Sequence, residues 1–277
     1  MPPLDIEFAN VSDKGRKRPH NEDSSVTDSG VCLALVADGM GGYKAGEVAS
    51  AIAAKAVLDG MREKGGKAGP RRSAADGQAS SAEAQLIRDC IQVANRHIFE
   101  TAHAIPQCHG MGTTIVAAVF SEGRVTLAHV GDSRIYRFRG EELKQVTNDH
   151  SLVQELIDRG FFTPEEAQAN TPKNLVTRAL GIDEHVEVDV QEMETLPGDI
   201  FLLCSDGLND MVNDEEIRLT LSKYSANLSQ AAHELVRLAN EGGGKDNISV
   251  VLARPRTGAP GSAGLLAKVT RLFTRGS

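Results

Sequence analysis

The most constraining feature of this sequence is an apolar run that ends directly in a carboxylate. Residues 33–37, Leu-Ala-Leu-Val-Ala, are followed by Asp38, and Gly39 comes next. Since the apolar residues do not alternate with polar ones, the run predicts a strand covered on both faces, with Asp38 at the edge of the core. Glycine allows a backbone carbonyl to approach an ion closely, so this pair is suited to a site for a hard cation.

The same arrangement recurs at two later places in the chain, and a fourth aspartate stands at another strand edge. Asp206 follows the apolar run 200–204, Asp132 follows the run 125–130, and Asp246 stands in a glycine-rich stretch before the run 248–252. Asp-Gly pairs commonly mark simple turns, and a single instance would carry little weight. The repetition of this pattern favours a site shared by the four aspartates.

The remaining pattern predicts further strands and helices. Polar and apolar residues alternate over 4–11, and short turns divide 113–146 into four strands that read as an antiparallel meander. A helical insertion is expected at about 147–181, with a capping box from Thr163 to Glu166. Other strands are expected at about 185–191, 199–204 and 248–252, and helices at about 46–61, 83–104, 214–223 and 228–241.

These elements predict an α+β fold in one domain over residues 1–254. The expected architecture is a layered α-β-β-α sandwich of two mainly antiparallel sheets flanked by helices, which would gather the four aspartates at one end. Residues 65–82 read as a flexible surface loop. Residues 255–277 read as a linker and a short basic amphipathic tail, either a weak membrane-surface or partner-binding segment or a frayed terminus.

Charge and cysteine content restrict the class of protein. The net charge is −8, and the first 253 residues carry 25 basic and 38 acidic residues, which argues against nucleic acid as the main partner. The four cysteines lack CxxC spacing, so a reduced, cytoplasmic protein without zinc is expected. Cys90 and Arg96 match the spacing of cysteine-dependent phosphatases, but the glycine-free segment between them continues a helix. No signal peptide or 18-residue apolar span is evident.

Clustered carboxylates predict bound metal. Four unpaired carboxylates repel one another and have raised pKa values unless divalent cations lie between them. Oxygen donors without a nearby Cys or His pair favour magnesium or manganese. Two such ions about 3.5–4 Å apart can share a bridging hydroxide and hold a phosphoryl group for in-line attack.

The polar loop 13–23 has two interpretations. It places Arg16, Lys17 and Arg18 shortly before Glu22 and Asp23. It is either a solvated charged loop or an anion site beside a metal site, because an arginine binds phosphate oxygens in bidentate fashion.

Seven blocks of the sequence resemble the metal-dependent type 2C protein serine/threonine phosphatases, specifically their compact bacterial members. They occur in that family's order and span about residues 6–253. The blocks are Asp13 to Asp23, Val36 to Gly42, Gly112 to Thr114, Val130 to Arg134, Asn174 to Gly181, Cys204 to Leu208 and Lys245 to Ser249.

The resemblance implies hydrolysis of phosphoserine and phosphothreonine in proteins by a metal-bridging water or hydroxide, reversing a bacterial serine/threonine kinase in a signalling circuit. It implies two core Mn²⁺ or Mg²⁺ ions and a weaker third one, in a monomer. The 147–181 insertion corresponds to a flap that varies with substrate. The implied metal ligands are Asp38 as the bridge, the Gly39 carbonyl, Asp206 and Asp246, with Asp132 at the third site; Glu22, Asp23 and Asn247 would act through water, and Arg18 would bind phosphate.

One departure from some members of that family concerns the proton donor. Eukaryotic members have His where this chain has Met40, so the donor to the leaving group is either metal-bound water or His150. Two other functions stay open at this point. They are a catalytically weak relative that binds or senses phosphoproteins, and a hydrolase of small phosphate esters.

Overall fold

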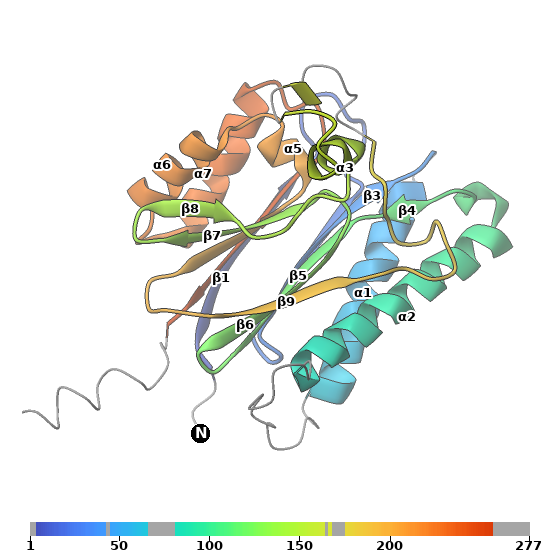
Figure 1. Ribbon diagram of the computed structural model, residues 1–277, viewed down its shortest axis with the longest axis horizontal. Coiled ribbons are helices and arrows are strands. Elements are labelled where there is room, and N and C mark those ends of the chain that lie inside the picture. Colours follow the sequence, from blue (N-terminus) through green and yellow to red (C-terminus); the bar gives the residue numbers. More distant parts are fainter. Residues whose placement is uncertain (1–3, 43–44, 66–80, 164–165, 168–174, 257–277) are drawn as a thin grey trace, which may run out of the picture.

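The computed structural model describes residues 4–42, 45–65, 81–163, 166–167 and 175–256. Two antiparallel sheets stack face to face, and helices cover the outer face of each sheet (Figure 1). The expected α-β-β-α sandwich is therefore confirmed.

The first sheet has the order β1-β11-β10-β7-β8, and the second has the order β2-β3-β5-β6-β9 with β4 beside β3. Every strand pair in both sheets is antiparallel. The strands are β1 Ile6–Asp13, β2 Asp23–Asp28, β3 Leu33–Met40, β4 Gly112–Thr113, β5 Ile115–Ser121, β6 Arg124–Val130, β7 Arg134–Arg139, β8 Glu142–Gln145, β9 Asp189–Glu194, β10 Ile200–Cys204 and β11 Ile248–Pro255.

Four of the described helices, α2, α3, α6 and α7, begin at a residue whose side chain caps the helix. Ser81 caps α2 by accepting a hydrogen bond from the Ala84 N–H, and Asn213 and Glu216 form a reciprocal capping box at α6. The helices are α1 Ala45–Gly65, α2 Ala82–Ala104, the 3-10 turn η1 Pro106–Cys108, α3 Leu152–Asp158, α5 Asp206–Asn209, α6 Asp214–Lys223 and α7 Leu228–Glu241.

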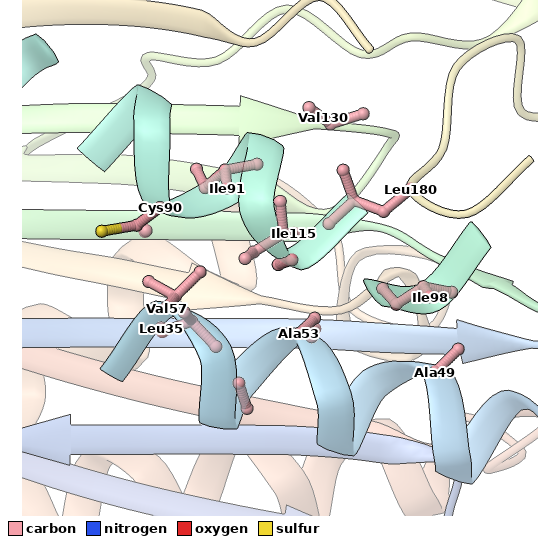
Figure 2. Close-up of a cluster of buried hydrophobic side chains, with 14 of the residues drawn as sticks. Leu35, Ala49, Ala53, Val57, Cys90, Ile91, Ile98, Ile115, Val130 and Leu180 are labelled. Carbon is pink, nitrogen blue, oxygen red and sulfur yellow. The ribbon is translucent and has the colours of Figure 1, made fainter. Parts of the chain in front are cut away.

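Strand β3 is apolar from Leu33 to Ala37, and both of its faces are buried there, as predicted. Leu33, Leu35 and Ala37 belong to the core beneath α1 and α2, and Figure 2 shows Leu35 facing the side chains of those helices. Ala34 and Val36 belong to the core between the two sheets. Since side chains alternate along a strand, Asp38 continues the second series and lies at the end of the space between the sheets.

The predicted four-strand meander over 113–146 is wrong. β6 pairs with β9 in the second sheet, whereas β7 pairs with β10 in the first. The turn at Gly131 carries the chain from one sheet to the other, with φ of +107° and a position where an added Cβ would lie 2.6 Å from Thr114 Cβ. A short polar turn looks the same in sequence whether the next strand pairs with the last one or crosses to another sheet.

Other boundaries also differ from the sequence predictions. β2 was not predicted, because its residues Asp-Ser-Ser-Val-Thr-Asp are all only half-buried and lack an apolar face. The strands expected at 4–11 and 185–191 run instead over Ile6–Asp13 and Asp189–Glu194. The capping box between Thr163 and Glu166 is present.

Parts of three predicted segments fall outside the described residues: 66–80 of the loop, 164–165 and 168–174 of the insertion, and 257–277 of the tail. Among the residues that are described, no helix has the length and apolar character needed to cross a membrane.

Candidate metal centre

Asp38 and Asp23 face each other across the pair of strands β2 and β3. They are register partners in the antiparallel ladder, so both carboxylates lie at the same end of the space between the sheets. The backbone of Asp38 is fixed from the other side by two threonines. Thr113 Oγ1 donates to Asp38 O at 2.8 Å, and Asp38 N donates to Thr114 Oγ1 at 3.3 Å.

Asp206 and Asp246 approach from the first sheet. Asp206 follows β10 and begins the short helix α5, while Asp246 stands just before β11. The two segments are in close backbone contact, since a Cβ added to Gly207 would lie 2.0 Å from Asn247 O. The edges of both sheets therefore deliver aspartates to one place, as the sequence predicted.

Thr114 also connects Asp38 to the turn that carries Asp132. Its Oγ1 lies 2.7 Å from Ser133 Oγ, and Ser133 is the residue after Asp132. Asp132 is buried, with 9% of its surface exposed. The Gly112-Thr113-Thr114 block is thus a support that sets the position of two carboxylates.

The carboxylates interact strongly enough to change their ionisation. Burial raises the pKa of Asp38 well above its ordinary value, and the negative charges of Asp23, Asp206, Asp132 and Asp246 raise it further. Burial, followed by the charge of Asp132, raises the pKa of Asp206 to about 8. In the absence of a cation, this cluster holds protons at pH values where ordinary carboxyl groups are ionised.

The pKa values of two neighbouring carboxyl groups are also raised. The pKa of Asp23 rises to about 6, chiefly through burial, although hydrogen bonds from Ser249 and Ser205 lower it. The pKa of Asp132 also rises to about 6 through burial and the charge of Asp149. The negative charge of Asp210 also raises the pKa values of both Asp206 and Asp132. The sequence analysis did not identify this residue.

The donor set fits divalent hard cations. Asp206 Oδ1 and Asp23 Oδ1 are buried and have no hydrogen-bond partner among the described residues, so each is free to meet an ion or a water bound to one. The backbone at Gly39 is equally enclosed: an added Cβ would lie 2.1 Å from Gly46 O and 2.5 Å from Glu22 O. Such packing keeps the carbonyl of Gly39 beside the carboxylates.

Arg18 lies at the rim of the carboxylate cluster. Its Nη2 donates to Asp246 Oδ2 at 2.6 Å, and about half of its side chain is exposed. The hydrogen bond to Asp246 raises the pKa of the guanidinium, which remains a permanent positive charge at the entrance. The structure thus brings Arg18 together with the predicted metal ligands.

Asn247 holds the loop that carries Arg18 and Glu22. Its Nδ2 donates to Lys14 O at 3.0 Å and to His20 O at 2.9 Å, and its Oδ1 accepts from Glu22 N at 2.8 Å. The side chain is buried. These contacts give Asn247 a positioning role, while its action through metal-bound water stays a prediction.

His150 is enclosed in a network of its own. Its Nδ1 accepts a hydrogen bond from Gly131 N at 3.1 Å, so the proton of the neutral ring is on Nε2, which lies 3.3 Å from Asp189 Oδ2. Both nitrogens are therefore engaged within the protein, and the histidine is not free to protonate a leaving group.

A second metal site at this network is disfavoured by the same geometry. Ligand atoms of His129, His150 and Asp189 lie within 4.8 Å of one another. However, a proton on His150 Nε2 blocks that nitrogen, and Arg178 Nη1 already lies 2.8 Å from Asp189 Oδ1. The group is an internal hydrogen-bond network that joins the 147–181 insertion to β9.

Comparisons with known proteins indicate a single family. The model of the family described as Protein phosphatase 2C matches residues 16–241. The chain is 40% identical over 244 residues to the serine/threonine phosphatase stp of Listeria monocytogenes serovar 1/2a. The alignment covers 87% of this chain and 92% of that protein.

Solved structures agree with this similarity. The crystal structure of the Mycobacterium tuberculosis serine/threonine phosphatase PstP/Ppp is 38% identical, has a TM-score of 0.80, and matches 91% of this chain and 99% of that one. A structure of the PstP catalytic domain in complex with two manganese ions is 37% identical, has a TM-score of 0.76, and matches 90% of this chain and 97% of that one.

Proposed function

Because this chain belongs to the protein phosphatase 2C family and is a protein-serine/threonine phosphatase, we propose that its carboxylate cluster binds two manganese or magnesium ions. Asp38 would bridge the two ions, the Gly39 carbonyl would complete one site, and Asp206 and Asp246 would complete the other. The observation that carries this assignment is the buried, unpartnered Asp206 Oδ1 in a cluster made only of oxygen donors. Bound ions would activate water and neutralise charge that develops on the phosphoryl group.

Other residues of the chain would bind the substrate phosphate and position water. Arg18 would bind phosphate oxygens of the phosphoserine or phosphothreonine, because its guanidinium already lies at the edge of the cluster through Asp246. Glu22 and Asp23 would orient water beside the ions. Asp23 is held for this by Ser205, whose Oγ donates to Asp23 Oδ2 at 2.8 Å.

Asp132 would supply a third, weaker ion site shared with Asp206. The support for this is electrostatic: the charge of Asp132 is the first cause after burial of the raised pKa of Asp206. An ion between them would remove that repulsion.

The leaving serine or threonine oxygen must receive a proton. Met40 stands half-buried after Gly39 and has no group that titrates. Because His150 uses both ring nitrogens elsewhere, we assign this proton to water at the site.

We propose the wider biological setting from the same family. The substrates are phosphoproteins, and the phosphatase would oppose a serine/threonine kinase in a cytoplasmic signalling circuit. We propose that residues 1–254 act as one monomeric catalytic domain with the 147–181 insertion as its flap, and that 255–277 is an appended tail.

Metal-stripped protein tests the proposal directly. Hydrolysis of para-nitrophenyl phosphate and of a phosphothreonine peptide is measured while manganese or magnesium is titrated back. Activity on both substrates that depends on metal is the expected result. Folded protein that stays inactive on both would leave the cluster as a binding or sensing site, and activity on the small ester alone would favour a hydrolase of small phosphate esters.

A further inference from the structure

Beside the carboxylate cluster lies a set of basic side chains that metal binding and phosphate binding do not use. We call Lys14, Arg16, Lys17 and Lys245 the basic rim. All four residues are exposed, and they come from two places far apart in the sequence.

Backbone contacts hold the two parts of the basic rim together. Arg16 N and Lys17 N both donate to Gly244 O, at 2.7 and 3.1 Å. Gly15 packs so closely that an added Cβ would lie 2.1 Å from Asp246 O. The turn that carries Lys245 is therefore fixed against the loop that carries the other three residues.

The basic rim borders Arg18, the residue proposed to bind the substrate phosphate. Arg18 follows Lys17 directly and donates to Asp246 Oδ2 at 2.6 Å, while Lys245 precedes Asp246. The buried amide of Asn247 donates to the carbonyl of Lys14 at 3.0 Å. Lys14, Lys17 and Lys245 are thus each adjacent, in sequence or through a hydrogen bond, to a residue of the site, and Arg16 is held beside them by its bond to Gly244 O.

The side chains of the rim have no structural partner that explains their charge. None of the four forms an ion pair with a described residue, whereas Arg18 next to them does. They also contrast with the rest of the chain, since the first 253 residues have a net charge of −13. A local positive potential on an acidic protein attracts negatively charged groups to this place in particular.

We propose that the basic rim binds acidic residues that flank the phosphorylated serine or threonine of the substrate. The proposal rests on the proposed function and adds a substrate class to it. A phosphopeptide fits better than a long polyanion, because nucleic acid would extend over the acidic remainder of the surface. The ligands are carboxylates of aspartate and glutamate side chains, within a few residues of the phosphate.

The size of the expected preference for acidic flanking residues follows from the strength of exposed ion pairs. Each such pair contributes a factor of about 1.4 to 5 in affinity, so two contacts give about 2- to 25-fold. The preference should weaken as salt is added, since exposed charges are screened.

The experiment compares two phosphothreonine peptides of equal length, one with aspartate and glutamate flanks and one with neutral flanks. The ratio of their kcat/KM values is measured for the manganese-loaded protein and for Lys17→Ala/Lys245→Ala. Arg124→Ala/Lys144→Ala is the matched control, because it also removes two exposed positive charges. Arg124 begins β6, about 20 Å along that strand from the turn with Asp132.

The expected result is a ratio of about 2 to 25 in the wild type and in the control variant, and a clearly smaller ratio in the rim variant, which keeps only Lys14 and Arg16 of the rim. Equal kcat/KM for the two peptides in the wild type overturns the rim proposal, as does a preference in the rim variant that is as large as in the wild type. Para-nitrophenyl phosphate has no flanking residues, so its hydrolysis reports the metal centre of each variant separately. If turnover is absent altogether, dissociation constants of non-hydrolysable phosphonate peptides still decide the question, and equal values overturn the rim.

Discussion

Ser205 Oγ donates a hydrogen bond to Asp23 Oδ2 at 2.8 Å and accepts one from Ser249 N at 2.9 Å. Because Asp23 belongs to one sheet and Ser249 to the other, this hydroxyl joins the two sheets next to the carboxylate cluster. Ser205 is fully buried, so both bonds are shielded from water.

Replacing this serine should reduce stability. In Ser205→Ala, Asp23 Oδ2 loses the donor Ser205 and Ser249 N loses its side-chain acceptor, and a buried polar group left unpaired costs about 1–3 kcal/mol. The free energy of unfolding, measured by denaturant titration of the metal-free protein, should fall by about that amount. Ser229→Ala on the exposed surface of α7 is the control and should change it by less than about 0.5 kcal/mol. Equal values for Ser205→Ala and the control would contradict the role of this bond.

The sequence predicted that these aspartates come together because each of them has a local signature. Asp38 and Asp206 each follow an apolar run and precede a glycine, and Asp246 follows a glycine-rich stretch. Antiparallel sheets with buried faces then leave few places where such residues can go. The importance of Ser205 has no comparable signature, since its partner Asp23 is distant in the chain.

What the sequence could not predict depends on contacts between distant segments. The strand β2 is polar, and it forms because it pairs with the buried strand β3. The chain crosses between the sheets at Gly131, which lies against the distant residue Thr114, and no local pattern encodes that contact. His150 appeared as a candidate proton donor only because its partners, Gly131 and Asp189, were unknown.

Arg18→Ala should chiefly weaken substrate binding. The change removes a charge-assisted hydrogen bond to the phosphate, worth about 1.5–3 kcal/mol, which corresponds to roughly a 10- to 150-fold loss. Steady-state kinetics with a phosphothreonine peptide should show this loss mainly as a higher KM. Since Arg18 also pairs with Asp246, metal affinity should be measured in parallel by calorimetry.

Arg62→Ala offers a matched comparison for Arg18. Arg62 is similarly exposed and is paired with Asp28, but it lies on α1 and takes no part in the centre. Its removal should leave both KM and metal affinity within about twofold of the wild type. An unchanged KM in Arg18→Ala would reject the assignment of phosphate binding.

Asp132→Ala should change the metal dependence without abolishing the two-ion core. The variant loses one carboxylate of the weak site, but Asp38, Asp206 and Asp246 remain. Activity titrated against manganese should reach half of its maximum at a higher metal concentration, while two strongly bound ions persist in calorimetry. A titration curve identical to that of the wild type would count against a third site.

The raised pKa values predict how pH affects the metal-free protein. A carboxyl group with a higher pKa in the folded state binds its proton more tightly there, so it stabilises the fold at low pH. That contribution is lost as the pH rises towards the folded-state value. Asp23 and Asp132, with pKa values of about 6, and Asp206, with about 8, place this loss between about pH 4 and pH 8. The melting temperature of metal-free protein should therefore fall across this interval through these groups.

Manganese provides the control for this pH effect, because bound cations keep the carboxylates ionised and remove their repulsion. Burial lowers the pKa of His129 and His150, which acts in the opposite direction, but that contribution is common to metal-free and metal-loaded protein. The increase in melting temperature on adding manganese should thus be larger at about pH 8 than at about pH 5.

In Asp38→Asn, the metal-free protein should be more stable at about pH 8 than the wild type, since one of the repelling charges is gone, and manganese should add little. A manganese effect on the wild type that is the same at both pH values would show that these carboxylates are not the groups that bind the ions.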